Sequence, residues 1–121
     1  MENAVIKLEK NVDQYNKLSA EQLILATMAQ SSFMQQSETL ADLTQSEFDK
    51  KLVGQNRGVK QAGFIVLIGA SMPNVLIELG FISNKNDARR LKQSAYRQKA
   101  AQGIFDALMK YKTRHEKLLS P

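Results

Sequence analysis

The chain has 121 residues, a net charge of +5, 43% hydrophobic residues and 24% charged residues, which is the balance of an ordinary globular domain. It contains no cysteine and a single histidine, which excludes disulfides, thiolate metal sites and cysteine nucleophiles, and one histidine alone cannot make a catalytic zinc site. No apolar run approaches the roughly 20 residues of a membrane span, and no signal peptide is visible in this chain.

The first half of the chain is predicted to be helical. Residues 2–17 carry apolar side chains at three-to-four spacing, which fits a short amphipathic helix. Ser19 and Gln22 match a capping box, and no glycine or proline follows before Gly54. The pattern predicts one helix of about thirty residues with a bend near residues 31–32.

Two short apolar runs follow a loop rich in turn formers. Residues 64–68 (FIVLI) and 75–79 (VLIEL) adjoin glycines and contain β-branched residues, which is typical of buried strands. Asn84 is among the candidate caps of a short helix that ends near Leu91, and Ser94 is expected to cap a final helix.

The expected fold class is therefore α/β, with about two core strands and several helices. Because a two-stranded sheet is marginal by itself, the other strands are expected either outside these residues or in a partner chain. Exposed strand edges would then favour self-association.

Glu78 is the unusual residue of the second predicted strand, which is otherwise apolar. A buried carboxylate needs a cation or ionises abnormally, and the end of a strand is a common place for active-site chemistry in α/β proteins. Two plainer interpretations remain open. Glu78 forms a structural ion pair with Arg57 or Lys60, or it lies on a rim and faces solvent.

Residues 56–61 form a polar, glycine-containing loop directly before the first predicted strand. Loops at strand ends often carry binding residues, and Arg57 could hold a carboxylate through a bidentate contact. The plainer interpretation is a solvated connection in which Arg57 and Lys60 are ordinary surface cations. His115 is expected to be an exposed residue near the end of the chain.

The run from residue 56 to residue 84, NRGVKQAGFIVLIGASMPNVLIELGFISN, closely resembles the C-terminal signature of zinc-dependent N-acetylmuramoyl-L-alanine amidases of the amidase-3 type. Residues 36–41 and 100–111 resemble the preceding and final helices of that family. Residues 2–34 resemble, more weakly, an insertion of Bacteroidetes-type members. The resemblance implies that residues 1–121 are the C-terminal portion of one catalytic domain, a mixed sheet flanked by helices, with residues 1–34 as an inserted helical region and 35–115 as the family core.

The resemblance also implies a function. The family cleaves the amide bond between N-acetylmuramic acid and the L-alanine of the peptidoglycan stem peptide, in the periplasm or outside the cell. Glu78 matches the catalytic glutamate, and Arg57 and Lys60 would flank the substrate groove. The zinc of the parent domain is held by residues upstream of this match, so this chain alone is expected to hold no metal and to be inactive.

Two other functions compete with the amidase. One is a non-catalytic module, derived from an amidase, that binds peptidoglycan or a partner. The other is a basic nucleic-acid binder, which only the positive charge favours, because no helix-turn-helix or aromatic stacking platform is visible. No nucleic acid is therefore expected as a partner.

Overall fold

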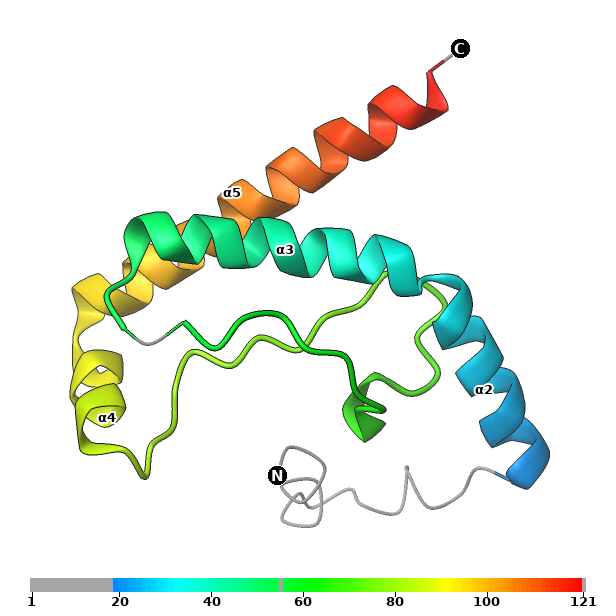
Figure 1. The fold of residues 1–121 in the computed structure, drawn as a ribbon, viewed down its shortest axis with the longest axis horizontal. Coiled ribbons are helices and arrows are strands. Elements are labelled where there is room, and N and C mark those ends of the chain that lie inside the picture. Colours follow the sequence, from blue (N-terminus) through cyan, green and yellow to red (C-terminus); the bar gives the residue numbers. More distant parts are fainter. Residues whose placement is uncertain (1–18, 55, 121) are drawn as a thin grey trace. The chain divides into compact units, whose positions relative to one another are not determined.

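The computed structural model describes residues 19–54 and 56–120, and these are largely helical (Figure 1). In chain order the elements are α2 (Ala20–Ser32), α3 (Met34–Lys51), the 3-10 turn η3 (Ile65–Leu67), α4 (Lys85–Lys92) and α5 (Ser94–Leu119). The described residues form two compact units, the first made of 19–37 and 60–76 and the second of 38–54, 56–59 and 77–120. Within these ranges no helix combines the length and hydrophobicity that a membrane crossing needs.

The helix predicted between Ser19 and Gly54 begins as expected but is two helices. The Ser19 hydroxyl accepts the Gln22 N–H at 3.2 Å, and the Gln22 side chain accepts the Ser19 N–H at 2.9 Å, so the capping box is confirmed. The predicted bend is an interruption at Phe33. Its N–H donates to the Gln30 carbonyl, three residues earlier, which is the tighter turn of a 3-10 helix.

Serine side chains explain where the interruption falls. The hydroxyls of Ser31 and Ser32 donate to carbonyls of the preceding turn, those of Met28 and Ala29, at 2.8 and 2.7 Å. Such back-bonding competes with the helical ladder and bends helices. The helical pattern then resumes when the Ser37 N–H donates to the Phe33 carbonyl.

The predicted α/β fold is wrong for the described residues, which contain no strand and no sheet. Of the first predicted strand, residues 65–67 form the turn η3, held by bonds from the Leu67 and Ile68 N–H groups to carbonyls three residues earlier. A short apolar run has the same pattern in a buried strand and in a helical turn, and only a partner strand could decide between them. No described segment supplies that partner.

The second predicted strand, residues 75–79, is also neither strand nor helix (Figure 1). Leu76 and Glu78 are exposed while Val75, Ile77 and Leu79 are half-buried, which is the alternation of an extended chain. Among the described residues, no backbone hydrogen bond joins this segment to another. The described residues therefore offer no sheet edge through which the expected self-association could occur.

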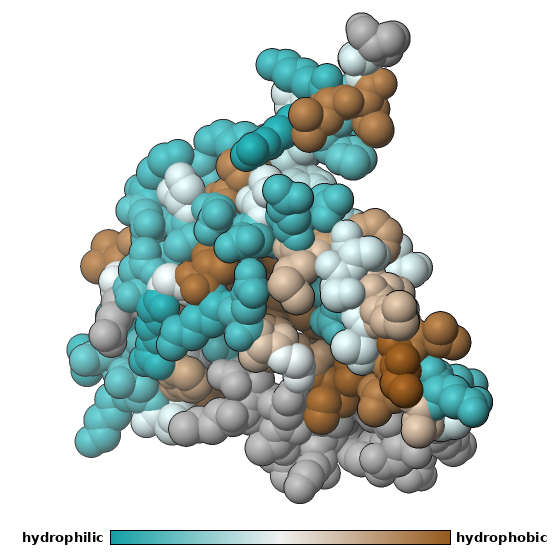
Figure 2. All heavy atoms as spheres, turned by 45° about the vertical axis from the view of Figure 1, so that its right-hand side comes forward, coloured by the Kyte–Doolittle hydropathy of each residue, from teal (hydrophilic) through white to brown (hydrophobic). Residues whose placement is uncertain are grey.

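The second unit is built on the packing of α3 against α5. The apolar core is small, since the buried hydrophobic residues of the described chain are Leu40, Ala100 and Ala107. Gly103 of α5 lies so close to α3 that an added Cβ would be 2.9 Å from the Phe48 ring. Figure 2 shows correspondingly many brown, apolar side chains on the surface. The close approach of the helices depends on small residues rather than on large buried ones.

The two C-terminal helices agree well with the sequence prediction. Asn84 caps α4, and its side chain accepts the N–H groups of Asn86 and Asp87 at 3.0 and 3.1 Å. The cap position of α5 is Gln93, without a side-chain bond, so the cap expected at Ser94 is wrong by one residue. 

Candidate functional site

Glu78 lies in the irregular segment before α4, in the second unit. Its side chain is exposed, so the predicted burial in an apolar strand is wrong, and the alternative of a solvent-facing position holds. Within the part of the chain that the structure describes, its carboxylate has no hydrogen bond and no ion pair. It therefore differs from a structural ion-pair partner and is free to meet a substrate or a water molecule.

Arg57 belongs to the same unit and lies close to the Glu78 segment. Its guanidinium carbon is 4.4 Å from the centroid of the Phe81 ring, three residues beyond Glu78. This is a cation–π contact, and it leaves the exposed guanidinium able to donate hydrogen bonds. Lys60 is exposed and belongs to the first unit.

Asp87, in the first turn of α4, holds the turn that follows Glu78. Its Oδ2 accepts the Phe81 N–H at 3.0 Å, and its Oδ1 accepts Nη2 of Arg90 at 2.5 Å. The bond from the Phe81 backbone, and then the Arg90 guanidinium, hold the pKa of Asp87 below its ordinary value despite partial burial. Gly80 has φ 147°, and a Cβ there would lie 3.0 Å from that of Asp87.

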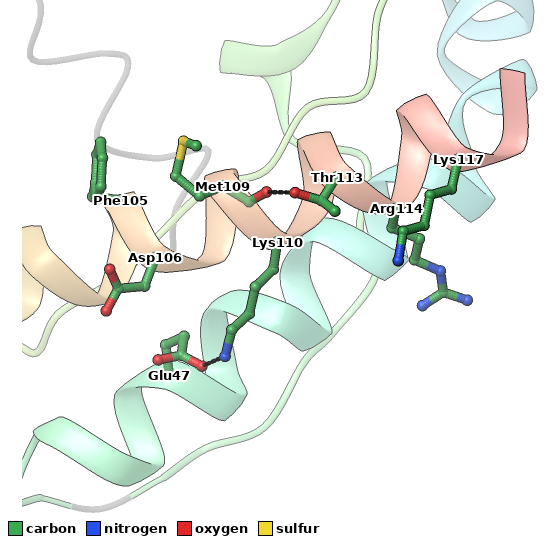
Figure 3. Close-up of a pocket in the computed structure, with 8 residues that line it drawn as sticks. All are labelled: Glu47, Phe105, Asp106, Met109, Lys110, Thr113, Arg114 and Lys117. Atoms are coloured by element: carbon green, nitrogen blue, oxygen red, sulfur yellow. Dashed lines mark hydrogen bonds and ion pairs between the residues drawn. The ribbon is translucent and has the colours of Figure 1, made fainter. Parts of the chain in front are cut away.

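A second set of charges lies between α3 and α5 and contains none of the predicted site residues (Figure 3). Glu47 is only 3% exposed, and its carboxylate pairs with Lys50 at 2.9 Å, with Lys51 at 2.6 Å and with Lys110. Lys51 also pairs with Asp106 at 2.9 Å. We call these five residues the Glu47 cluster.

The Glu47 cluster is electrostatically satisfied. The hydrogen bonds from Lys110, Lys51 and Lys50 hold the pKa of Glu47 far below its ordinary value, and the reciprocal contacts raise the pKa of Lys51 and Lys110. An open groove beside it is lined by residues of α5, including Phe105, Met109 and Arg114 (Figure 3). Both oxygens of the Glu47 carboxylate accept hydrogen bonds from lysines, so the cluster is best explained as a link between two helices.

No metal centre is formed by residues 19–54 and 56–120, because they contain no group of three or more His, Cys, Asp or Glu side chains that could hold an ion. The exposed His115 stacks on Tyr111 of the preceding turn, with ring centroids 6.1 Å apart. The zinc that the family resemblance implies thus has no fitting donor set among these residues.

Sequence reasoning missed the roles of Asp87, Arg90 and Glu47. Asp87 stands three residues after the Asn84 cap, where an acid favours the start of a helix, but its bond to Phe81 depends on a turn that no local pattern shows. Glu47 is followed at three and four residues by Lys50 and Lys51, which was a visible signal. The contribution of Lys110, 63 residues further on, was not visible.

The comparisons with known proteins identify the family of this chain. Residues 7–110 match the amidase-3 family, described as N-acetylmuramoyl-L-alanine amidase. Since this match covers most of the chain, the chain belongs to that family.

Individual relatives are similar over about two thirds of the chain. N-acetylmuramoyl-L-alanine amidase LytC of Bacillus subtilis is 44% identical over 75 residues, which are 62% of this chain and 15% of that protein. The uncharacterized protein YqiI of the same organism is 43% identical over 75 residues, 62% of this chain and 36% of that protein. The probable cell wall amidase LytH of Staphylococcus epidermidis is 39% identical over 79 residues, 65% of this chain and 27% of that protein. No solved structure matches.

Proposed function

We propose that this chain supplies the catalytic carboxylate of a peptidoglycan hydrolase, which cleaves the amide bond between N-acetylmuramic acid and the L-alanine of the stem peptide. Two of the three relatives described above are amidases by name. The chain covers between 15% and 36% of the length of the three, so the activity of the whole protein is part of the proposal. The residue assigned to this role is Glu78.

The observation that supports this role is the free, exposed carboxylate of Glu78 in an otherwise apolar segment. In contrast, three acids of the same unit, Glu47, Asp87 and Asp106, are each bound to cations or backbone donors. A general base must be able to reach the proton that it accepts, so an unpaired carboxylate is the better candidate.

The chemistry assigned to Glu78 is proton transfer. Its carboxylate would accept a proton from the attacking water and pass it to the nitrogen of the leaving amine. Arg57, which contacts the ring of Phe81 three residues beyond Glu78, would bind a carboxylate of the stem peptide through its free donors. Lys60 is kept as a second substrate-binding cation on the basis of the family resemblance.

The zinc of the family is proposed to bind elsewhere. His115 is the only histidine of the sequence, and the described acids do not gather into a set of three donors. We therefore infer that residues outside this chain hold the metal, and that the 121 residues alone do not hydrolyse peptidoglycan. The proposed place of action is the cell wall, outside the cytoplasm.

A non-catalytic wall-binding module is the second candidate function. It is favoured by the basic side chains along α5, where Lys110, Arg114 and Lys117 line one groove, and by the net charge of +5. Binding of this chain to purified peptidoglycan, lost at high salt, together with no hydrolysis by the full-length protein, would favour this module over the enzyme.

The deciding experiment measures release of stem peptide from purified peptidoglycan by the full-length protein, with Zn²⁺ present or chelated. Glu78→Gln is compared with Glu38→Gln, which removes an exposed charge from α3. We expect Glu78→Gln to lower kcat by about 10²- to 10⁴-fold and Glu38→Gln to leave it near the wild-type value. Full activity of a folded Glu78→Gln protein would refute the assignment.

A further inference from the structure

Asp87 lies where it can control the backbone that carries Glu78. Among the described residues, no backbone hydrogen bond holds residues 75–80, so the chain around Glu78 gets no support from a sheet. The first fixed point beyond it is the Phe81 N–H, which donates to Asp87 Oδ2 at 3.0 Å. Only two residues, Leu79 and Gly80, separate this point from Glu78.

The turn between these points is also shaped by close packing. Gly80 has φ 147°, a conformation that L side chains rarely adopt. A Cβ at Gly80 would lie 3.0 Å from Cβ, 3.1 Å from Cγ and 3.2 Å from Oδ2 of Asp87. The Asp87 side chain therefore packs against the bare backbone of Gly80 while its carboxylate binds the next N–H.

Asp87 is itself held in place. The Asn84 side chain caps the helix and accepts the Asp87 N–H at 3.1 Å. Arg90, one turn later on α4, donates to Oδ1 at 2.5 Å, and only 14% of the Asp87 side chain is exposed. The carboxylate is thus fixed at a helix start and from a second side by a guanidinium group.

The same contacts reach the loop that carries Arg57. The Arg90 guanidinium lies 3.5 to 3.7 Å from the position of a Cβ on Gly54, so it packs against that backbone. Arg57, three residues later, stacks on Phe81 at 4.4 Å. Asp87, through Phe81 and Arg90, therefore links the two segments that carry the candidate site residues of this unit.

We propose that Asp87 is a positioning residue, which fixes the Gly80–Phe81 turn through the Phe81 N–H and so sets the direction of the Glu78 carboxylate. This inference rests on the proposed function of Glu78. It adds that a residue on α4, acting through the backbone next to Glu78, affects the rate of the proton transfer more than the affinity for substrate.

The test compares Asp87→Ala, Asp87→Asn and Asp106→Ala in the full-length protein. Alanine removes the acceptor of the Phe81 N–H, whereas asparagine keeps one oxygen that can accept it. Asp106→Ala is the matched control. Like Asp87, Asp106 is a carboxylate bound to a basic side chain, here Lys51, but it lies on α5, and the Phe81 N–H donates to Asp87 rather than to it. Stem-peptide release gives kcat and KM, and kcat is divided by the folded fraction from circular dichroism.

We expect Asp87→Ala to lower the normalised kcat by about 100-fold with little change in KM, because a small displacement of a catalytic group has an effect of this size. Asp87→Asn should recover most of the rate, and Asp106→Ala should match the wild type. A normalised kcat for Asp87→Ala equal to that of the control overturns the inference, even if the variant is less stable. Retained activity in Glu78→Gln would instead overturn the proposed function, so the two failures can be told apart.

Discussion

Glu47 and Glu78 are two acids of the same unit in opposite surroundings. Glu47 lies between α3 and α5, is 3% exposed and pairs with three lysines. Glu78 lies in an irregular segment, is exposed and has no partner among the described residues. The acid in an apolar sequence is the exposed one, and the acid in a polar helix is the buried one.

The difference separates a structural carboxylate from a candidate catalytic one. A buried carboxylate with several cations stabilises the packing only while every partner is present, since a lone buried charge is costly. An exposed carboxylate without partners contributes little to folding, but it is accessible to substrate. Three changes test this contrast, from the largest expected effect on stability to the smallest.

Removing the buried carboxylate should have the largest effect. Glu47→Ala leaves Lys51 and Lys110 facing one another without their shared partner, and we expect the thermal midpoint to fall by about 10 °C or more. Glu78→Ala should change it by less than about 2 °C. Far-UV circular dichroism on heating measures both. Equal losses for the two variants would contradict the distinction.

Acid should have the next largest effect. The pKa of Glu47 is lowered from an ordinary 4.5, so its stabilisation is complete above that pH and is lost as the pH falls below it, toward the folded-state pKa. Between about pH 7 and about pH 3 the wild-type midpoint should fall about 5 °C further than that of Glu47→Gln. The pKa values of Asp87 and Asp106 are also lowered, so the thermal midpoint of Glu47→Gln should still fall in acid, but by less than that of the wild type. Parallel pH curves for the two proteins would exclude Glu47 as the source.

Single lysines should have the smallest effects, and unequal ones. Lys51 is 25% exposed and joins Glu47 to Asp106, whereas Lys50 is 57% exposed and contacts Glu47 alone. Lys51→Ala should lower the midpoint by about 3 °C, and Lys50→Ala by less than about 1 °C, because exposed ion pairs contribute little. The reverse order in thermal unfolding would show that bridging by Lys51 is unimportant.

Most local signals in the sequence were reliable, although the cap expected at Ser94 lies at Gln93. The capping box at Ser19 and Gln22, the bend beside Ser32 and the Asn84 cap were all found, because each depends on residues within one or two turns. The family was identified from a continuous run of residues for the same reason. Such features need no knowledge of distant partners.

Features that depend on distant partners were not predictable. The runs at 64–68 and 75–79 have the composition of strands, but a strand exists only with a ladder partner, and no described segment supplies one. The burial of Glu47 depends on Lys110 across the sequence, and the exposure of Glu78 follows from the missing sheet. The assignment of Glu78 as the catalytic glutamate stays a prediction.

The Ser37 hydroxyl has a consequence for the order of folding. It donates to the Phe33 carbonyl at 2.8 Å and accepts the Asn74 N–H at 3.0 Å, so it joins two segments of the first unit that lie 37 positions apart in the sequence. The first turn of α3 must form before the hydroxyl is oriented to receive Asn74. Helix formation takes about 0.1–1 μs, and closing a long loop is entropically unfavourable. The turn at residues 33–37 should therefore form before Asn74 binds to it.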